Sequence, residues 1–429
     1  MKTLALLAIS ALLAVSCVCA AQDKAFYLKN GDIVLFYGDS ITEQRLYSVI
    51  VETYVATHYP DRDVTFVNSG WGGDKVSGGG GGPIDTRLKR DVFPYRPTVI
   101  TIMLGMNDGN YTTETQENDE KYFSGYRHII DSLRSNLPQA RIAAIEPSPY
   151  DDITRPPTFP VSGDSLYNEV MRSFGKWIAS YAKQSGLDVV DANATVVNAL
   201  IQAHVSDPEN AKSIIPDHVH PSFGGHLLMA GELLKAWGAR PVVTGVAIDA
   251  SHPAVKLESA EFATVSNLSN SGTVSWTELD EALPLPFKQW GEGDDGASVN
   301  TVIRNSDIVN TLNRQILRVK GLRSGTYSLK IDGASVAAFN NDQLAAGVNL
   351  ALVKTPATDQ AMKIFQLATS REEVHFDLWR NVDVPLADYA MPETRPAIDS
   401  MNSLDVAISK KMREVARPVP HRFELVPIS

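Results

Sequence analysis

The amino-acid sequence predicts an α/β fold with a parallel sheet over residues 24–240, followed by an accessory module of strands and helices over 241–429. Three observations support this prediction. Short apolar runs alternate with helical stretches through the first part of the chain, as in βαβ units. Residues able to carry chemistry come directly after the apolar runs. Beyond Arg240, segments that alternate apolar and polar residues indicate antiparallel strands instead.

The strands expected in the first part of the chain are short, and helical stretches lie between them. The expected strands span 33–37, 64–67, 99–104, 141–145 and 187–190, and the expected helices span 43–58, 121–137, 165–184 and 223–237. Ligands bind beyond the carboxyl ends of the strands in such sheets. We therefore expect the segments after the first four strands to converge on one face: Ser40, 68–74, 105–110 and 146–152.

The accessory module is expected to be β-rich over 241–335 and helical over 340–418. Its expected strands are 274–276, 315–320 and 326–331, and its expected helices are 359–380 and 397–416. The last two strands flank a glycine-bounded loop, a pattern typical of a β-hairpin. The last helix carries an apolar stripe that indicates core packing: Ile398, Met401, Leu404, Ile408, Met412 and Val415.

The first twenty residues have the pattern of a secretory signal peptide. Lys2 gives a positive start, an apolar stretch covers 4–15, and small residues before Ala21 offer a cleavage site after Ala20. The apolar stretch is short for a membrane span. Lipoprotein anchoring through Cys17 is the alternative, although the usual leucine is missing. We expect a secreted or periplasmic protein.

Composition narrows the classes of function. Cys17 and Cys19 are the two cysteines, and both lie in the expected signal peptide, so disulfides and cysteine-ligated zinc are not expected after cleavage. The formal charge of -11 disfavours nucleic acid or an anionic membrane surface as the main partner. Composition predicts neither a substrate nor an oligomeric state.

Ser40 lies in the sequence Gly-Asp-Ser-Ile-Thr, directly after an expected strand. Serine is a weak nucleophile, so it needs a base to accept its proton and a third group to orient that base. The alternative is structural, because Ser40 and Glu43 also have the spacing of a helix capping box.

The sequence Asp-His-Val-His-Pro begins at Asp217 and offers such a base. Asp217 stands three residues before His220 and can reach its Nδ1 atom, which leaves Nε2 to serve the serine. A metal site made by Asp217, His218 and His220, with His226 beyond, is the alternative, although no HExxH-like spacing accompanies it. His218 is otherwise expected to face solvent.

Two loops could supply hydrogen bonds to an oxyanion. Glycines in 68–74 allow the backbone to approach a ligand and to point an amide at it. Asn107, in the loop after the third expected strand, could donate its side-chain amide to the same oxygen. Ordinary glycine-rich and Asn-Asp turns are the structural alternatives for these two loops.

These four blocks together, Gly-Asp-Ser-Ile-Thr, Asn-x-Gly-x-x-Gly-Asp, Gly-x-Asn-Asp and Asp-x-x-His-Pro, resemble the SGNH/GDSL hydrolase superfamily. The resemblance covers about the first half of the processed chain. It implies a flavodoxin-like three-layer α/β/α sandwich. It also implies Ser40 as nucleophile and oxyanion donor, Gly73 and Asn107 as further oxyanion donors, and His220 as the base oriented by Asp217. The insertion at 76–83 departs from the pattern, and the region after 240 resembles no family.

The resemblance implies a carboxylic ester hydrolase without a metal or organic cofactor. Members of the superfamily deacetylate polysaccharides and sialic acids, cleave lipids, or process thioesters. Export favours an acetylated glycan, so we expect a carbohydrate O-acetylesterase or short-acyl esterase. Asp39, Trp71 and Asp108 are candidate substrate-binding residues, with Trp71 either stacking on a sugar or packing internally. The alternatives are a lipase or lysophospholipase, and an inactive glycan-binding scaffold.

Overall fold

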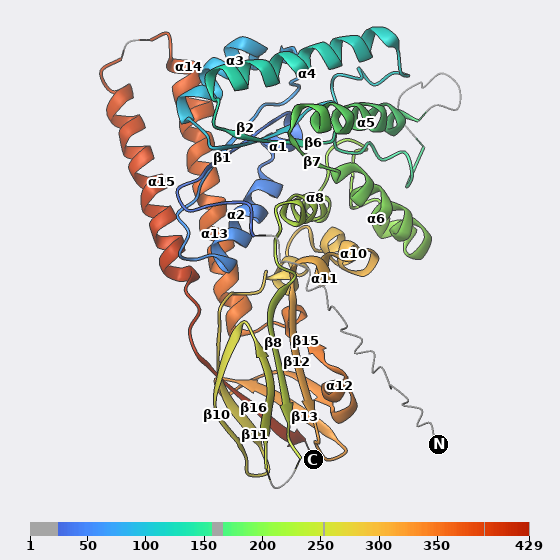
Figure 1. The fold of residues 1–429 in the computed structure, drawn as a ribbon, viewed down its shortest axis with the longest axis vertical. Helices are drawn as coiled ribbons and strands as arrows, with labels where there is room; N and C mark the ends of the chain where they lie inside the picture. The colour runs from blue at the N-terminus through green and yellow to red at the C-terminus, as the bar shows by residue number, and fades with distance from the viewer. Residues whose placement is uncertain (1–24, 157–165, 252–253, 390, 429) are drawn as a thin grey trace, which may run out of the picture.

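The computed structural model describes residues 25–156, 166–251, 254–389 and 391–428. Helices surround a central sheet at one end of the molecule, and antiparallel strands form the other end (Figure 1). The signal-peptide and lipoprotein predictions concern residues 1–24, which lie outside the described residues. No helix within the described ranges is both long enough and apolar enough to cross a membrane.

The central sheet has the order β2-β1-β5-β6-β7, and all its strands are parallel. Its strands are β1 (Ile33–Gly38), β2 (Thr65–Gly70), β5 (Val99–Met103), β6 (Arg141–Ile145) and β7 (Asp188–Val190). Each overlaps an expected strand. β1 and β5 are buried along nearly their whole length, because helices cover both faces of a parallel sheet.

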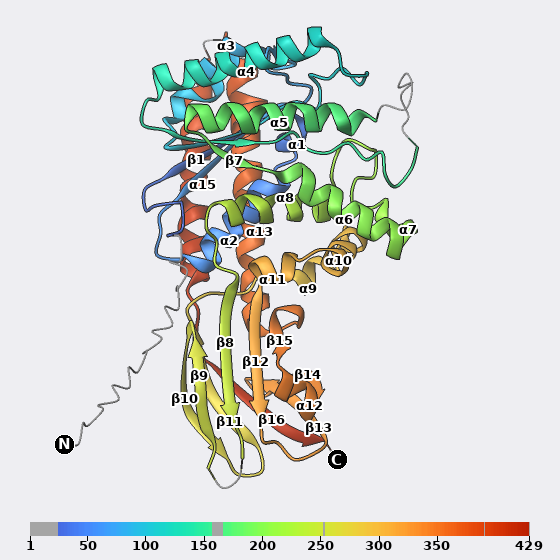
Figure 2. The ribbon, with the colours of Figure 1, turned by 45° about the vertical axis from the view of Figure 1, so that its right-hand side comes forward.

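Helices lie on both faces of this sheet, which confirms the parallel α/β prediction (Figures 1 and 2). One face carries α3 (Ile84–Asp91), α4 (Gln116–Asn136) and α5 (Tyr167–Ser185), and the other carries α2 (Leu46–His58) and α8 (Phe223–Ala236). Thr115 caps the amide of Asn118 at the start of α4. Gly186, at φ 66°, ends α5 in the left-handed conformation that glycine tolerates.

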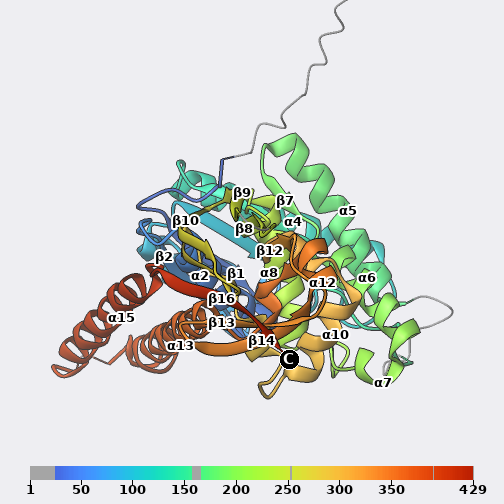
Figure 3. The same ribbon diagram turned by 90° about the horizontal axis from the view of Figure 1, so that it is seen from below.

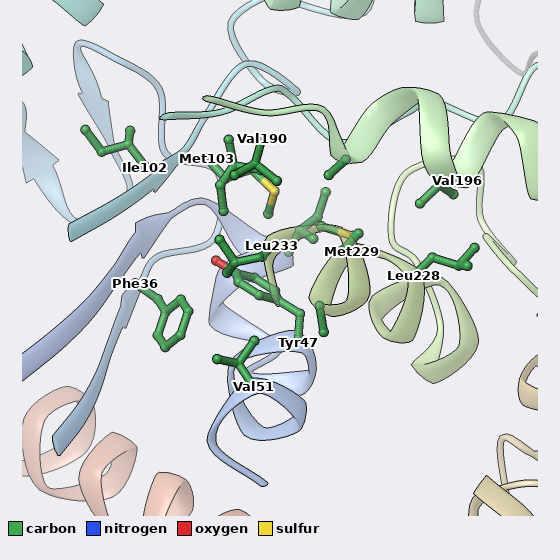
Figure 4. Close-up of a cluster of buried hydrophobic side chains, with 14 of the residues drawn as sticks. Phe36, Tyr47, Val51, Ile102, Met103, Val190, Val196, Leu228, Met229 and Leu233 are labelled. Carbon is green, nitrogen blue, oxygen red and sulfur yellow. The ribbon is translucent and has the colours of Figure 1, made fainter. Parts of the chain in front are cut away.

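A continuous cluster of buried hydrophobic side chains fills the space between the sheet and the pair α2 and α8 (Figure 4). Phe36 of β1 contacts the Tyr47 ring edge-on at 5.4 Å, and Leu233 of α8 is completely buried. Each such side chain stabilises the fold by about 1.5–3 kcal/mol. This packing fixes the position of β1, from whose carboxyl end Ser40 follows.

Two further sheets form the other end of the molecule. One has the order β10-β11-β16-β13-β14 and the other the order β15-β12-β8-β9. Their strands are β8 (Val242–Asp249), β9 (Lys256–Glu261), β10 (Ala263–Asn270), β11 (Val274–Asp280), β12 (Arg314–Lys320), β13 (Thr326–Ile331), β14 (Ala334–Asn340), β15 (Val348–Asn349) and β16 (His421–Ile428). They share a core that includes Trp276, Val319 and Leu425.

The predicted hairpin between 315–320 and 326–331 is wrong, although both strands exist. β12 pairs in parallel with β8, whereas β13 pairs with β14 and β16 in the other sheet. The connecting loop begins at Gly321, at φ 75°, and takes the chain from one sheet to the other. Alternation of apolar and polar residues predicts a strand but does not identify its partner.

Helices also occur between the strands of this region. The main ones are α9 (Phe287–Trp290), α10 (Gly296–Asn305), α11 (Ile308–Leu312) and α12 (Asn341–Ala346). α10 and α11 contact α8, and α10 also contacts α6 (Ala192–Ser206). The boundary near residue 240 stays a prediction, since helices that follow it in sequence pack directly on the central α/β layers.

Two long helices, α13 (Pro356–Phe376) and α15 (Thr394–Ala416), lie side by side and join the two ends of the molecule (Figures 1 and 3). α13 packs on α2 and continues into a π-helix, Asp377–Asp383. The apolar stripe of α15 is only partly buried. Met412 is in a core cluster with α2, but Leu404 is 49% exposed.

The remaining elements are short: α1 (Ser40–Glu43), β3 (Gly78–Gly79), β4 (Gly82–Pro83), a 3₁₀ turn (Phe93–Tyr95), α7 (Pro208–Ala211), a second 3₁₀ turn (Leu350–Leu352) and α14 (Val384–Leu386). β3 and β4 pair with each other inside the insertion at 76–83.

Candidate active site

Ser40 is the first residue of α1 and follows the carboxyl end of β1. Asp39 is the N-cap of this helix, because its Oδ1 accepts a hydrogen bond from Ile41 N–H at 3.0 Å. The capping-box alternative for Ser40 is therefore wrong. The Ser40 Oγ atom instead lies 2.9 Å from Nε2 of His220.

Asp217 holds the His220 ring from the opposite side. Its Oδ2 lies 2.7 Å from His220 Nδ1, and its Oδ1 accepts the backbone N–H groups of His220 at 2.7 Å and Val219 at 3.0 Å. Burial raises the pKa of Asp217, but the hydrogen bonds from His220 and Val219 outweigh it and leave the pKa below its ordinary value. An ionised Asp217 favours the tautomer with hydrogen on Nδ1, which leaves Nε2 free to accept the serine proton.

His218 is buried, and the prediction that it faces solvent is wrong. It is 5% exposed, and its backbone is left-handed, at φ 73°. The ring stacks on Tyr150 at 5.3 Å, and Nδ1 lies 2.6 Å from the backbone oxygen of Asp151. The segment after β6 thereby supports the loop that carries Asp217 and His220.

The histidines of the alternative metal site do not converge. His226 is buried, its Nε2 lies 2.8 Å from Gln44 Oε1, and burial lowers its pKa to about 3. His218 and His220 are bound to Asp151 and Asp217 respectively. The described part of the chain contains no cluster of three or more histidine, cysteine or acidic residues with metal-binding geometry.

The loop after β2 passes directly beside Ser40. A Cβ atom at Gly72 would lie 3.9 Å from the Cβ of Ser40 and 2.8 Å from Oε2 of Glu43, so a side chain there would displace Glu43. Gly73 follows at φ 76°, a left-handed conformation in which other residues are strained. The backbone conformation at position 73 therefore favours glycine, whereas a side chain at position 72 requires only that the end of Glu43 move.

Two hydrogen bonds hold the side-chain amide of Asn107, and one of them goes to the loop after β2. Nδ2 donates to the backbone oxygen of Asp74 at 3.1 Å, and Oδ1 accepts from the hydroxyl of Tyr111 at 3.2 Å. Nδ2 has a second hydrogen with which it could donate to a ligand. Tyr111 was not identified from the sequence, because no local pattern predicts its φ of 55° or its contact with Asn107.

The three candidate substrate-binding residues do not line the cleft at Ser40. Asp39 is 2% exposed, and Asp108 is 8% exposed with its Oδ1 accepting from Val76 N–H at 3.0 Å. Trp71 is also 8% exposed, and the guanidinium carbon of Arg380 lies 3.0 Å from its ring centroid. Trp71 therefore packs internally instead of presenting its ring to a sugar.

A cleft of about 830 Å³ opens beside Ser40 and His220. Most of the residues that line it are polar or charged. The α1–α2 junction contributes 43–46, the histidine loop contributes 216, 217 and 220–222, and the C-terminal region contributes Phe376, Arg380 and Asn381. The sequence did not indicate this last contribution, since no motif marks these residues.

Burial also changes the ionisation of Asp39. It raises the pKa of Asp39 to about 7, against the hydrogen bond from Ile41, and the carboxylates of Asp108 and Asp74 add to the rise. An unfolded aspartate has a pKa of about 3.9. Between these values the folded state holds a proton that the unfolded state has released, so the free energy of unfolding falls as pH rises.

Asp39→Asn keeps the helix cap and removes this ionisation. We therefore compare the free energy of unfolding of the variant with that of wild type. The difference, variant minus wild type, should be at least about 1 kcal/mol larger at pH 8 than at pH 5. Urea denaturation at both pH values measures this difference. The exposed Asp131→Asn is the matched control and should show a constant difference. An equally constant difference for Asp39→Asn would contradict a raised pKa.

Comparison with known proteins agrees with the fold. Residues 36–228 match the family model of the GDSL-like Lipase/Acylhydrolase family. The matched region is thus a GDSL-like domain of the SGNH/GDSL hydrolase superfamily, and its class of activity is that of a serine carboxylic ester hydrolase. Both conclusions confirm the predictions made from the four sequence blocks.

Individual relatives differ in how much of the chain they match. An acetylxylan esterase from Geobacillus stearothermophilus is 24% identical over 228 residues, covering 49% of this chain and 95% of that protein. A structure described as a gut microbial diltiazem-metabolizing enzyme is 26% identical and covers 94% of this chain and 98% of its own, with a TM-score of 0.77. A crystal structure of an acetylxylan esterase from Geobacillus stearothermophilus covers 50% of this chain and 97% of its own, at 20% identity and a TM-score of 0.39.

Proposed function

We propose that this protein is a secreted or periplasmic esterase that releases acetyl or other short acyl groups from carbohydrate esters. The observation that carries the proposal is the chain of contacts from Ser40 Oγ to His220 Nε2 at 2.9 Å and from His220 Nδ1 to Asp217 at 2.7 Å. A serine activated in this way attacks an ester carbonyl, and the base is oriented by a third group.

In the proposed reaction, Ser40 Oγ attacks the carbonyl carbon while His220 Nε2 accepts its proton. Asp217 stabilises the imidazolium that forms. The oxyanion receives hydrogen bonds from the N–H groups of Ser40 and Gly73 and from Asn107 Nδ2. His220 then protonates the departing alcohol, and water, activated by the same histidine, attacks the acyl-enzyme to release the acid and restore Ser40.

The lining of the cleft favours a polar substrate over a lipid. Glu43, Gln44, Asp295 and Asn381 offer hydrogen bonds, and Phe376 is the one aromatic side chain among the described residues of the lining. A long acyl chain would need a continuous apolar groove. One relative is described as an acetylxylan esterase, which supports acetylated sugar as the substrate class.

Acyl preference tests this proposal. We expect acetate release from acetylated xylooligosaccharides, and p-nitrophenyl acetate hydrolysis at least about tenfold faster than hydrolysis of p-nitrophenyl decanoate. Diltiazem, an acetate ester, extends the series because a structurally similar enzyme is described as metabolizing it. Preference for the decanoate would instead indicate a lipase or lysophospholipase.

Asn107→Ala should lower kcat by about 10²–10³-fold, because one oxyanion donor typically contributes about 3–4 kcal/mol to the transition state. KM should change much less, since the oxyanion forms only after attack. Steady-state kinetics with p-nitrophenyl acetate separates the two parameters. The surface variant Asn136→Ala is the control. A rise in KM with unchanged kcat would place Asn107 in ground-state binding instead.

A further inference from the structure

The C-terminal region supplies one wall of the cleft at Ser40. After α13 ends at Phe376, the chain forms the π-helix Asp377–Asp383, and Arg380 and Asn381 from this segment line the cleft. Such widened turns often occur at functional sites because they shift the direction of the side chains that they carry. The family match ends at residue 228, so this wall is an addition to the matched region.

Contacts with the loop after Ser40 hold this wall in place. Arg45, at φ 64°, donates to Glu373 at 2.8 Å, and its guanidinium carbon lies 4.2 Å from the centroid of the Phe376 ring. Arg45 also donates to the backbone oxygen of Glu43 at 3.0 Å. The segment that carries Arg380 is thus anchored beside the nucleophile.

Arg380 is incompletely paired for a guanidinium group. It stacks on Trp71, and its one ion pair within the described residues is with Glu43 at 3.5 Å. Its N–H groups make no hydrogen bond to another residue in the described ranges, whereas Arg87 donates to Asp74 at 2.6 Å. The Arg380 side chain is 22% exposed, at the cleft.

Apart from the ion pair with Glu43, the N–H donors of Arg380 have no hydrogen-bond acceptor among the described residues. A guanidinium group has five N–H donors in a fixed plane, and leaving them unpaired in a partly buried position costs free energy. A substrate oxygen in the cleft would pair them. Three carboxylates (Glu43, Asp217 and Asp295) and two guanidinium groups (Arg45 and Arg380) line the cleft, so it carries no excess of positive charge to attract an anion, and its donors suit a neutral, oxygen-rich ligand.

We propose that Arg380 binds hydroxyl or carbonyl oxygens on the alcohol part of the ester and so selects oxygen-rich esters over simple aryl esters. The inference rests on the proposed function, in which Ser40 attacks an ester at this cleft. Trp71 holds the guanidinium plane, and Arg380 donates to oxygens next to the scissile bond.

The test compares Arg380→Met and Arg380→Lys with wild type on three acetate esters. Acetylated xylooligosaccharides and glycerol triacetate are oxygen-rich, and p-nitrophenyl acetate is the reference. We expect Arg380→Met to raise KM for the oxygen-rich esters about 10- to 100-fold, the usual effect of losing a charged hydrogen bond. Their kcat/KM relative to the reference should fall at least about tenfold, with Arg380→Lys intermediate.

Arg395→Met is the matched control, since Arg395 is 80% exposed, follows the same π-helix and does not line the cleft. Thermal unfolding checks that each variant is folded. An unchanged substrate ratio in Arg380→Met would overturn the inference, as would a wild type that hydrolyses neither oxygen-rich ester. If instead only the proposed sugar specificity is wrong, wild type will hydrolyse glycerol triacetate but not the acetylated xylooligosaccharides. The effect of Arg380→Met is then measured on glycerol triacetate.

Discussion

Ser40→Ala is expected to lower kcat for ester hydrolysis about 10⁴-fold or more, with little change in stability. The variant keeps the oxyanion donors and the cleft but lacks the oxygen that His220 activates, and loss of a triad nucleophile typically has an effect of this size. Acetate release and p-nitrophenyl acetate hydrolysis measure it, and Ser135→Ala, at an exposed position on α4, is the control.

Residual turnover above about one hundredth of wild type in Ser40→Ala would contradict covalent catalysis by this serine. The inactive-scaffold alternative makes a different prediction. In that case wild type would bind polysaccharide but leave p-nitrophenyl acetate intact, and Ser40→Ala would bind equally well. The 2.9 Å contact between Ser40 and His220 favours the active enzyme.

Arg371→Met is expected to have the largest effect on stability, lowering the free energy of unfolding by about 3–5 kcal/mol. Arg371 of α13 is 3% exposed and donates to both carboxylate oxygens of Glu52 on α2, at 2.6 and 2.7 Å. It also lies 3.4 Å from the buried Glu372. Removing the cation leaves both carboxylates buried without a partner. Urea denaturation at pH 8, where unpaired carboxylates are most costly, measures the loss.

Arg413→Met is the matched control for this prediction. Arg413 of α15 also bridges to the central layers, through Asp63 at 2.7 Å, but both side chains are substantially exposed. Exposed pairs contribute about 0–1 kcal/mol, so the control should lose little. The double variant Glu52→Leu with Arg371→Met should lose less than Arg371→Met alone. A loss below about 1 kcal/mol for Arg371→Met would show that apolar packing alone holds α13 on α2.

The sequence predicted the central sheet well, because the sheet depends on local patterns, whereas the oxyanion roles of Gly73 and Asn107 stay predictions. Apolar runs of five or six residues mark parallel strands, and strand ends bring Ser40 and Asn107 to one side. Asp217 and His220 are three residues apart, so their contact is nearly local. The superfamily and the ester hydrolase class followed from these blocks, and both are confirmed.

Features that depend on contacts between distant segments could not be predicted from the sequence. The partner of β12 depends on which sheet the loop after Gly321 enters. Glu52 pairs with Arg371 of α13, far along the chain, and Arg380 reaches the cleft because it follows the same helix. The positions of Asp39 and Trp71 in their motifs do not reveal that both side chains are buried.

The place of β16 has a consequence for the order in which the protein forms. This strand lies between β11 and β13 in the middle of its sheet, although it follows them by many residues. Until β16 has paired, both neighbours have an edge with unpaired backbone groups, which can associate with other chains. Nascent molecules thus pass through a vulnerable period before residues 421–428 arrive to close the gap.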